Sequence, residues 1–335
     1  MKHKLALSVT SILFLFGFLL YIPQVSAQDS AKGSGINLTV SPIFINLLAD
    51  PGKETTSKIK ITNNSNITEN LSTHLVKFKA SENGSQPTII DLDKDDEFAK
   101  WISFSEDSFS IASNETKTVT VKITPSTSAA LGYYYAVVFQ RTSEEKADKT
   151  GALVAGAPAV SILLEVKSPN AKREIQIVDA TSDKLFYEYL PADIKVKVKN
   201  TGNIHIIPVG NIFIDWGRKK DVSILTFNDG RGNILPNTER TYTATWNDAM
   251  ISTLDGRTKY DLTKADKFRI GRYTAHVLVV YDDGQRDVPL EAQVSFWVIP
   301  WKIIGLILIV GLFVLFGIRS MLSSGVQKLR KSKKK

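Results

Sequence analysis

The sequence predicts an all-β protein that consists of two tandem β-sandwich domains followed by one C-terminal transmembrane helix. Apolar and polar residues alternate with period two in many short runs, such as residues 58–62 and 194–199, and this period is typical of strands with one buried face. Turn-forming pairs such as Pro51-Gly52 separate these runs. Short alternating runs between such turns indicate β-sandwiches, and the apolar run of residues 303–318 indicates the helix.

An internal repeat indicates that the sandwich is duplicated. Three segments recur in the same order: residues 58–63 match 195–200, 111–121 match 234–244, and 132–136 match 271–275. Chance similarity between alternating strands is the alternative explanation, but the turns between the strands match as well. We therefore expect two domains that are related by duplication.

The third repeated segment carries the pattern Gly-x-Tyr, with Gly132 and Tyr134 in the first copy and Gly271 and Tyr273 in the second. In immunoglobulin-like sandwiches, a Tyr near the start of strand F bonds through its hydroxyl to the preceding corner of the chain. We therefore expect these four residues to have structural roles and both domains to be immunoglobulin-like. Two residues after each Tyr, where antibody domains have a bridging cysteine, this chain has alanine.

The repeat also sets the domain boundaries. We place the first immunoglobulin-like domain at residues 35–167 and the second at residues 172–298, with the linker 168–171 between them. Because this linker is short, the pair is expected to be semi-rigid. Residues 28–34 form a polar leader before the first domain.

The two ends of the chain predict an exported membrane protein. Residues 1–27 combine a basic start, an apolar middle and a small-residue exit, as a signal peptide does. We predict a transmembrane helix over residues 299–322 and a basic cytoplasmic tail over 323–335, because positive residues stay on the cytoplasmic side. A buried core helix is the alternative. The expected localisation is the cell membrane, as a single-pass type I protein with most of the chain extracellular.

The composition excludes several functions. The chain has 42 Lys and Arg against 34 Asp and Glu, but ten of the basic residues lie in the signal peptide, in the tail or at Lys302. The part between is slightly acidic, so the net charge of +8 gives no evidence for nucleic-acid binding. The absence of cysteine excludes thiol catalysis and thiolate metal sites.

Neither catalytic nor cofactor-binding motifs occur in the sequence. The chain after the signal peptide has only His74, His205 and His276, and it lacks the common nucleophile, metalloprotease and dinucleotide motifs. A pair of distant carboxylates, as in β-sandwich glycosidases, is the remaining route to an enzyme, but nothing selects such a pair. We therefore expect a non-catalytic protein without a cofactor.

Two clusters in the first domain could bind a ligand. The acidic stretch of residues 91–97 could hold calcium, but Asp96 stands where the EF-hand pattern has glycine, and Ile102 stands where it has glutamate, so a solvated loop is favoured. The residues Tyr133, Tyr134 and Tyr135 could form a platform for sugar stacking, but packing between sheets is favoured. We therefore predict no metal site.

The long connection from Arg141 to Pro158 is the leading contact region, because loops at the ends of a sandwich can vary while the strands hold the fold. Its charged first half supplies the candidate ligand-binding residues, which are Arg141, Glu144, Glu145 and Lys146.

Several motifs of the first domain resemble those of a known family. In order, they are Ser41-Pro42-Ile43, residues 50–53, Asn63-Asn64, Ala99-Lys100-Trp101, residues 114–121, residues 123–125 and residues 131–138. This series is similar to the N-terminal domain of the WxL-interacting proteins of Gram-positive bacteria, and the second domain, single span and lysine tail fit that family too. The resemblance implies a surface-anchored protein whose first domain contacts peptidoglycan and whose second domain contacts a host or partner protein.

We therefore expect a membrane-anchored extracytoplasmic binding protein that contacts a peptidoglycan-like cell-wall polymer or a surface protein partner. The alternative is an assembly or chaperone-like subunit that accepts a strand from a secreted surface protein, because an exposed sheet edge can pair with an extended segment.

Overall fold

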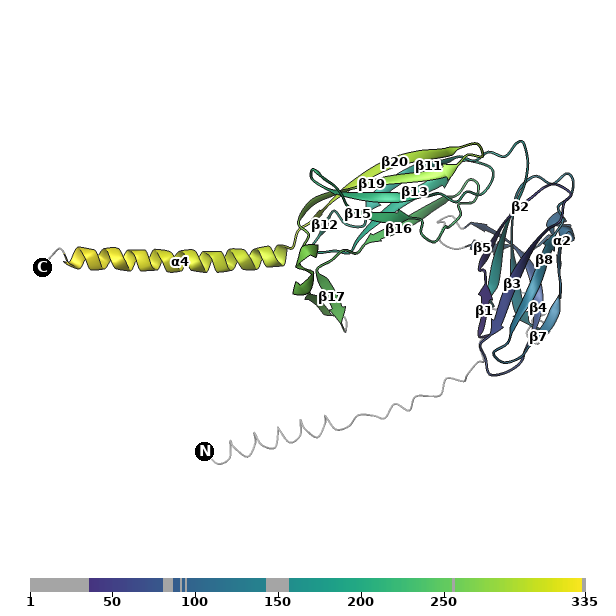
Figure 1. The fold of residues 1–335 in the computed structure, drawn as a ribbon, viewed down its shortest axis with the longest axis horizontal. Helices are drawn as coiled ribbons and strands as arrows, with labels where there is room; N and C mark the ends of the chain where they lie inside the picture. The colour runs from purple at the N-terminus through teal and green to yellow at the C-terminus, as the bar shows by residue number, and fades with distance from the viewer. Residues whose placement is uncertain are drawn as a thin grey trace, which may run out of the picture. The chain divides into compact units, whose positions relative to one another are not determined.

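The computed structural model describes residues 36–80, 87–90, 92–93, 95–142, 157–254 and 257–332. The predicted signal peptide and the polar leader lie outside these residues. The described chain consists mainly of strands and ends in one long apolar helix (Figure 1). This confirms the all-β prediction.

The strands up to Val166 are called the N-terminal β region. Its elements are β1 (Leu38–Ser41), β2 (Phe44–Ala49), β3 (Thr55–Asn63), β4 (Glu69–Ala80), β5 (Pro87–Ile90), α2 (Glu97–Trp101), β6 (Ile102–Phe104), β7 (Ser108–Ile111), β8 (Thr116–Ile123), β9 (Leu131–Arg141) and β10 (Ala159–Val166).

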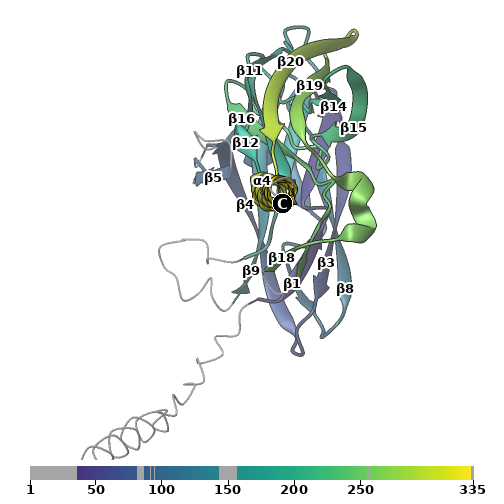
Figure 2. The same cartoon turned by 90° about the vertical axis from the view of Figure 1, so that its left-hand side faces the viewer.

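Two sheets form this region. One has the order β1-β3-β8-β6, and the other has the order β2-β10-β9-β4-β5, with β7 also paired to β4. Figure 2 shows β3 and β8 side by side. Alternate residues of both sheets point into one core, which includes the fully buried Ile59, Val121, Val137 and Ile162. The period-two pattern of the sequence therefore arises from strands with one buried face.

The strands from Ile175 to Val298 are called the C-terminal β region. Its elements are β11 (Ile175–Ser182), β12 (Phe186–Tyr187), β13 (Ala192–Asn200), β14 (Val209–Trp216), β15 (Lys219–Phe227), β16 (Glu239–Trp246), β17 (Ile251–Leu254), β18 (Arg257–Tyr260), the 3₁₀-helix η1 (Leu262–Lys267), β19 (Gly271–Asp282) and β20 (Asp287–Val298).

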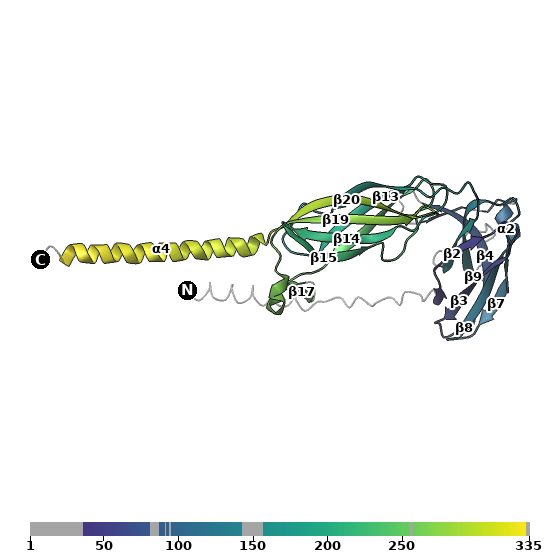
Figure 3. The ribbon, with the colours of Figure 1, turned by 45° about the horizontal axis from the view of Figure 1, so that its top comes forward.

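This region also has two main sheets, with the orders β11-β13-β16 and β12-β20-β19-β14-β15. The second of these is seen in Figure 3. A separate core lies between them and includes Ile194, Ile212, Val277 and Phe296. Strands β17 and β18 form a hairpin outside these sheets.

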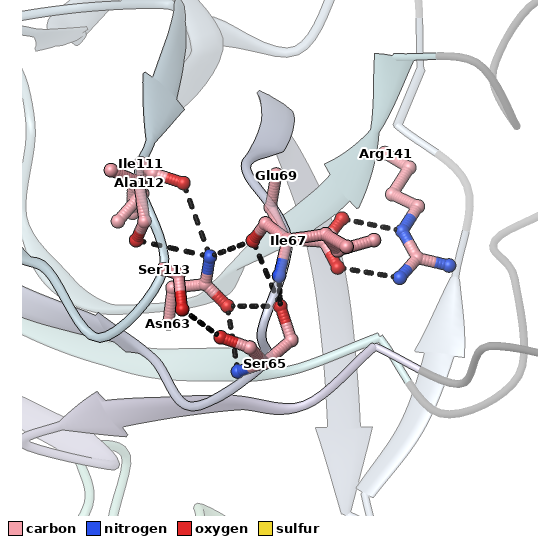
Figure 4. A network of polar contacts seen from close by, with 8 residues as sticks. All are labelled: Asn63, Ser65, Ile67, Glu69, Ile111, Ala112, Ser113 and Arg141. Atoms are coloured by element: carbon pink, nitrogen blue, oxygen red, sulfur yellow. Dashed lines mark hydrogen bonds and ion pairs between the residues drawn. The ribbon is translucent and has the colours of Figure 1, made fainter.

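The first two repeated segments have equivalent hydrogen bonds in the two regions. Asn63 ends β3, Asn200 ends β13, and both side chains are fully buried. Each side-chain amide donates to backbone carbonyls of two other chain segments. The acceptors are those of Ile67, Ile111 and Ala112 for Asn63 (Figure 4) and those of Ile204 and Ile234 for Asn200. Each asparagine thus ties its strand to two turns.

The matching turn uses a second asparagine. The backbone N–H of Asn114 donates to the carbonyl of Asn63 at 2.9 Å, and that of Asn237 donates to the carbonyl of Asn200 at 3.0 Å. Asn114 and Asn237 have φ angles of 59° and 58°, a left-handed conformation that asparagine tolerates better than most residues. The first two repeated segments therefore share their hydrogen bonds as well as their sequence pattern.

In the third repeated segment, the structural match between the two regions is shifted by one residue from the match in the sequence. Leu131 begins β9 opposite Val166, and Gly271 begins β19 opposite Val298. Both residues have positive φ angles, of 69° and 121°. By its position in the sheet, Leu131 rather than Gly132 is therefore the counterpart of Gly271.

This shift changes which tyrosine occupies the corner. Tyr133, not Tyr134, corresponds to Tyr273, and both lie against the main core of their region. The hydroxyl of Tyr133 accepts a hydrogen bond from the backbone N–H of Ala130 at 3.4 Å, and Tyr273 bonds to the backbone of Ile270, also three residues earlier. The assignment of Tyr134 is corrected because neighbouring strand residues point to opposite faces.

The C-terminal helix is α4 (Trp301–Ser332). Its first part, Trp301–Arg319, has a mean hydropathy of 2.5, and none of this span is buried against the rest of the described chain. A buried core helix would be covered, so the geometry is compatible with a single membrane anchor. The span lies within the predicted range of residues 299–322.

Candidate functional site

A pocket opens in the N-terminal β region where two neighbouring strands separate. β4 and β9 pair as far as Lys77 and Tyr135. From there β4 continues only in its pairing with β5, so residues 131–134 of β9 have no described strand on that side. The pocket has a volume of about 540 Å³. Its lining consists of Lys77, Phe78, Asp93, Asp95, Asp96, Glu97, Phe98, Gly132, Tyr133, Tyr134 and Tyr135.

One wall of the pocket is aromatic. Phe98 is the buried residue of α2, and its ring stacks on that of Tyr135 with a centroid distance of 4.0 Å. Tyr133 stacks near Phe98 at 6.2 Å and meets Trp101 edge to face at 5.0 Å. The helix begins here because a carboxylate oxygen of Asp96 accepts a hydrogen bond from the Phe98 backbone N–H at 3.0 Å. This cap holds the Phe98 ring against β9.

Asp96 is also the centre of the polar contacts. The Tyr135 hydroxyl lies 2.7 and 2.8 Å from its two oxygens and donates to them, and Lys77 Nζ lies 3.3 Å from Oδ2. Burial acts to raise the pKa of Asp96, but the hydrogen bonds from Tyr135 and Lys77 outweigh it and hold that pKa below its usual value. Burial and the Asp96 carboxylate raise the pKa of Tyr135, so its hydroxyl remains a donor.

The mouth of the pocket carries negative charge. Asp93, Asp95 and Glu97 are exposed, and none of them has an ion-pair partner among the described residues. Among the described residues of the lining, Lys77 is the one basic residue, and it already contacts Asp96. Carboxylates attract ammonium and guanidinium groups, and aromatic rings contact cations or apolar faces. The pocket therefore suits a ligand that combines positive charge with a flat, weakly polar face.

The described carboxylates of the acidic segment are not grouped as metal ligands are. In the part of the chain that the structure describes, no group of three or more His, Cys, Asp or Glu side chains is placed to hold a metal ion. The carboxylate of Asp96 contacts Tyr135 and Lys77 instead. Asp91, which belongs to the predicted acidic stretch, lies outside the described residues.

Arg141, a candidate ligand-binding residue, forms a buried ion pair in the structure, and its role in ligand binding stays a prediction. Its Nε and Nη2 atoms each lie 2.6 Å from a carboxylate oxygen of Glu69 (Figure 4). The side chains of Arg141 and Glu69 are 12% and 3% exposed. Such a pair is expected because a buried carboxylate needs a charged, hydrogen-bonded partner. The candidates Glu144, Glu145 and Lys146 lie outside the described residues, so their role stays a prediction.

The remaining predicted residues lie around the pocket and the corner. Gly132 lines the pocket, whereas Gly271 needs its glycine: φ is 121°, and a Cβ there would lie 2.7 Å from the Trp216 indole nitrogen. Tyr134 packs on the outer face of its sheet, with its ring centroid 6.5 Å from that of Phe78. The favoured alternative, packing rather than an open platform, therefore describes Tyr134.

Comparisons with known proteins give fold similarity only. No family model and no curated protein matches the chain. Among solved structures, the class 5 fimbriae chaperone CfaA is 12% identical, over 77% of this chain and 98% of that chain, with a TM-score of 0.37. The Escherichia coli chaperone DraB is 12% identical over 77% and 96%, with a TM-score of 0.31. The Pseudomonas aeruginosa chaperone CupB2 is 6% identical over 78% and 100%, with a TM-score of 0.32. Nothing about function follows from similarities this distant.

Proposed function

We propose that this chain is a non-catalytic, membrane-anchored binding protein of the cell exterior. In this proposal the two β regions are two immunoglobulin-like domains, α4 is a single-pass anchor with its C-terminus in the cytoplasm, and the pocket beside α2 contacts a cell-wall polymer. The pocket is the observation that supports the function, because it joins aromatic rings to unpaired carboxylates in one hollow.

The chemistry of the pocket favours a polymer that carries both sugar rings and free amines. The exposed carboxylates of Asp93, Asp95 and Glu97 can pair with ammonium groups. The half-buried ring of Tyr133, which stacks near the buried ring of Phe98, offers an apolar surface against which a sugar face can lie. A peptidoglycan-like polymer has both features, since its peptides carry amines between sugar strands.

Removal of the negative charge at the pocket mouth tests this proposal. The triple variant Asp93→Asn/Asp95→Asn/Glu97→Gln should bind insoluble wall material about tenfold more weakly, since rim charges contribute modestly to affinity. The measurement is sedimentation of the full chain, in detergent, with purified wall polymer.

A control variant removes the same charge elsewhere. Glu54, Asp179 and Asp229 are exposed and have no described ion pair, so Glu54→Gln/Asp179→Asn/Asp229→Asn should bind as the unmodified chain does. An equal loss of binding in both variants would show that the effect comes from the overall charge of the chain and not from the pocket. Unchanged binding by the pocket variant would contradict the proposal.

One observation favours the second candidate function, a subunit that accepts a strand. The backbone N–H of Trp297 donates to the carbonyl of Leu185 beside β12, so odd-numbered residues of β20 direct their N–H groups away from β19. β12 covers only Trp297 and Val298. The outer edge of β20 from Glu291 to Ser295 therefore has no hydrogen-bonded strand partner among the described residues, although β11 packs close to β20, and an edge without such bonds can pair with an extended segment.

A proline at the outer edge distinguishes this candidate. Pro289 already occupies an outward position of β20, so Gln293→Pro should leave the β19–β20 pairing intact while removing an outward donor. If β20 captures a partner strand on cells, Gln293→Pro should lose the partner in co-purification from cross-linked cells, and Gln293→Ala should retain it. Retention by both variants would count against strand capture.

A further inference from the structure

Exposed apolar side chains of the C-terminal β region gather at one end of its sheets. The strand register defines this end: β20 finishes at Val298, opposite the start of β19 at Gly271, and Trp216 at the end of β14 pairs with Tyr273. β12 pairs there with the last residues of β20. The chain continues from this end through Ile299 and Pro300 into α4.

We call this surface the anchor-proximal face. Its large apolar residues are exposed and come from several separate segments of the chain. They are Leu185, Phe186, Trp216, Tyr260, Leu262, Phe268, Ile270 and Trp297, and Trp301 follows at the start of α4. Elsewhere in the described C-terminal β region, the large exposed hydrophobic residues are Val178 and Ile224. Scattered surface residues would not gather at one end, so this face marks an interaction surface.

The segment around η1 belongs to this face because both of its ends meet the root of α4. Tyr260 and Phe268 line a small cavity together with Tyr189 and Pro300. Leu262 lies between them and is 79% exposed, although nothing in the fold requires an apolar side chain there.

The root of α4 is held by direct contacts. The backbone N–H of Ile299 donates to the carbonyl of Tyr187 at 2.7 Å, and Lys302 Nζ lies 2.9 Å from Oε2 of Glu188. Tyr189 and Tyr260 meet edge to face with a centroid distance of 6.4 Å. These contacts connect the anchor-proximal face to the first turn of the apolar helix.

The charge of this face is positive. Residues 257–272 contain six Lys and Arg against two Asp. Four exposed basic residues around this end have no ion pair among the described residues; they are Arg218, Lys219, Lys259 and Arg272. Tryptophan, tyrosine and long basic side chains are the residue types that settle at the headgroup level of a membrane, with apolar parts inward and charges toward phosphate.

We propose that the anchor-proximal face lies on the outer leaflet of the membrane, with Leu262, Phe268 and Trp297 among the headgroups and the basic residues paired with lipid phosphates. This inference rests on the membrane anchor of the proposed function, because α4 brings the face to the bilayer. A second copy of the chain is the other occupant that the experiment must distinguish.

The absence of cysteine allows a direct test with the full chain, because one introduced cysteine is the only labelling site. Single variants Leu262→Cys, Ile224→Cys and Ile309→Cys carry an environment-sensitive fluorophore, and the protein is reconstituted in vesicles of phosphatidylglycerol and phosphatidylcholine with a headgroup-attached quencher. Ile224 is the matched control, since it is exposed and pairs with Phe213 in mid-sheet. Ile309 reports on the anchor itself.

The proposal predicts that the probe at position 262 is blue-shifted and quenched several-fold more than the probe at position 224. It also predicts weaker quenching at position 262 in vesicles without phosphatidylglycerol. Equal quenching at 262 and 224, with the probe at 309 shielded in the bilayer, would overturn the inference but leave the anchor in place. Exposure of the probe at position 309 to water would overturn both the inference and the proposed membrane anchor.

A further measurement excludes a second copy of the chain. If the face were a dimer contact, labelled chains would show self-quenching at position 262 that grows with protein-to-lipid ratio, and that result would overturn the proposal.

The variant Leu262→Asp, with the probe at Leu185→Cys, gives an independent check. Because Leu262 is exposed, this change should preserve the fold while reducing lipid quenching at position 185; unchanged quenching would contradict the proposal.

Discussion

Replacement of Arg141 by methionine should destabilise the N-terminal β region by about 3–5 kcal/mol, because it leaves the buried carboxylate of Glu69 without its partner charge. Two contacts of 2.6 Å join these side chains at the start of β4 and the end of β9. The measurement is hydrogen exchange of the full chain, with the loss of protection expected across β4 and β9.

Two control variants isolate the cause. The double variant Glu69→Leu/Arg141→Met removes both charges and should regain much of the lost stability, since an apolar pair of similar size avoids an unpaired charge. Lys117 and Glu106 form a more exposed pair, so Lys117→Met should cost no more than about 1 kcal/mol. A loss for Arg141→Met as small as that for Lys117→Met would refute the structural role of Arg141.

Replacement of Asn200 by alanine should cost the C-terminal β region about 3 kcal/mol, because it removes three buried hydrogen bonds at roughly 1 kcal/mol each. The amide donates to the carbonyls of Ile204 and Ile234 at 2.8 and 2.9 Å, and its oxygen accepts from the N–H of Gly202 at 2.8 Å. Hydrogen exchange at β13 and β16 would report the loss directly.

The duplication makes a second prediction for the same contact type. Asn63→Ala should produce a loss of similar size in β3 and β8 only, since Asn63 has the equivalent contacts in the other region. The exposed Asn64 is the matched control, and Asn64→Ala should change stability by less than about 0.5 kcal/mol. Equal effects at Asn63 and Asn64 would show that the buried network contributes little.

Local patterns in the sequence predict much of this fold. The alternation of residues 58–62 predicts a strand, and β3 has alternate residues buried. The matches of Asn63 with Asn200 and of Asn114 with Asn237 predict equivalent turns, because a buried amide and a left-handed φ are properties of single residues. Such features can be recognised without knowledge of the tertiary structure.

The match of the Gly-x-Tyr segments is wrong by one residue for a physical reason. The sequence aligns Gly132 with Gly271, but the sheet aligns Leu131 with Gly271. In a strand, a shift of one residue moves each side chain to the other face. Three consecutive tyrosines offered a suitable side chain on both faces, so only the sheet pairing could place Tyr133 in the corner.

The pocket was beyond sequence reasoning because it depends on three distant segments. The sequence indicates a possible calcium loop at the acidic stretch and a possible platform at the tyrosines, but it does not place the two together. They meet because β4 leaves β9 after Lys77 and because Asp96 reaches both Phe98 and Tyr135. Nothing in the local pattern indicates where two paired strands will separate.

Cross-linking from the pocket on intact cells tests the proposed function most directly. A single Asp95→Cys variant, labelled with a photoactivatable group, should form adducts with insoluble wall polymer, whereas the same label at Glu54→Cys should not. Adducts at both positions, or adducts from position 95 that contain only protein, would contradict the proposal that the acidic pocket binds the wall.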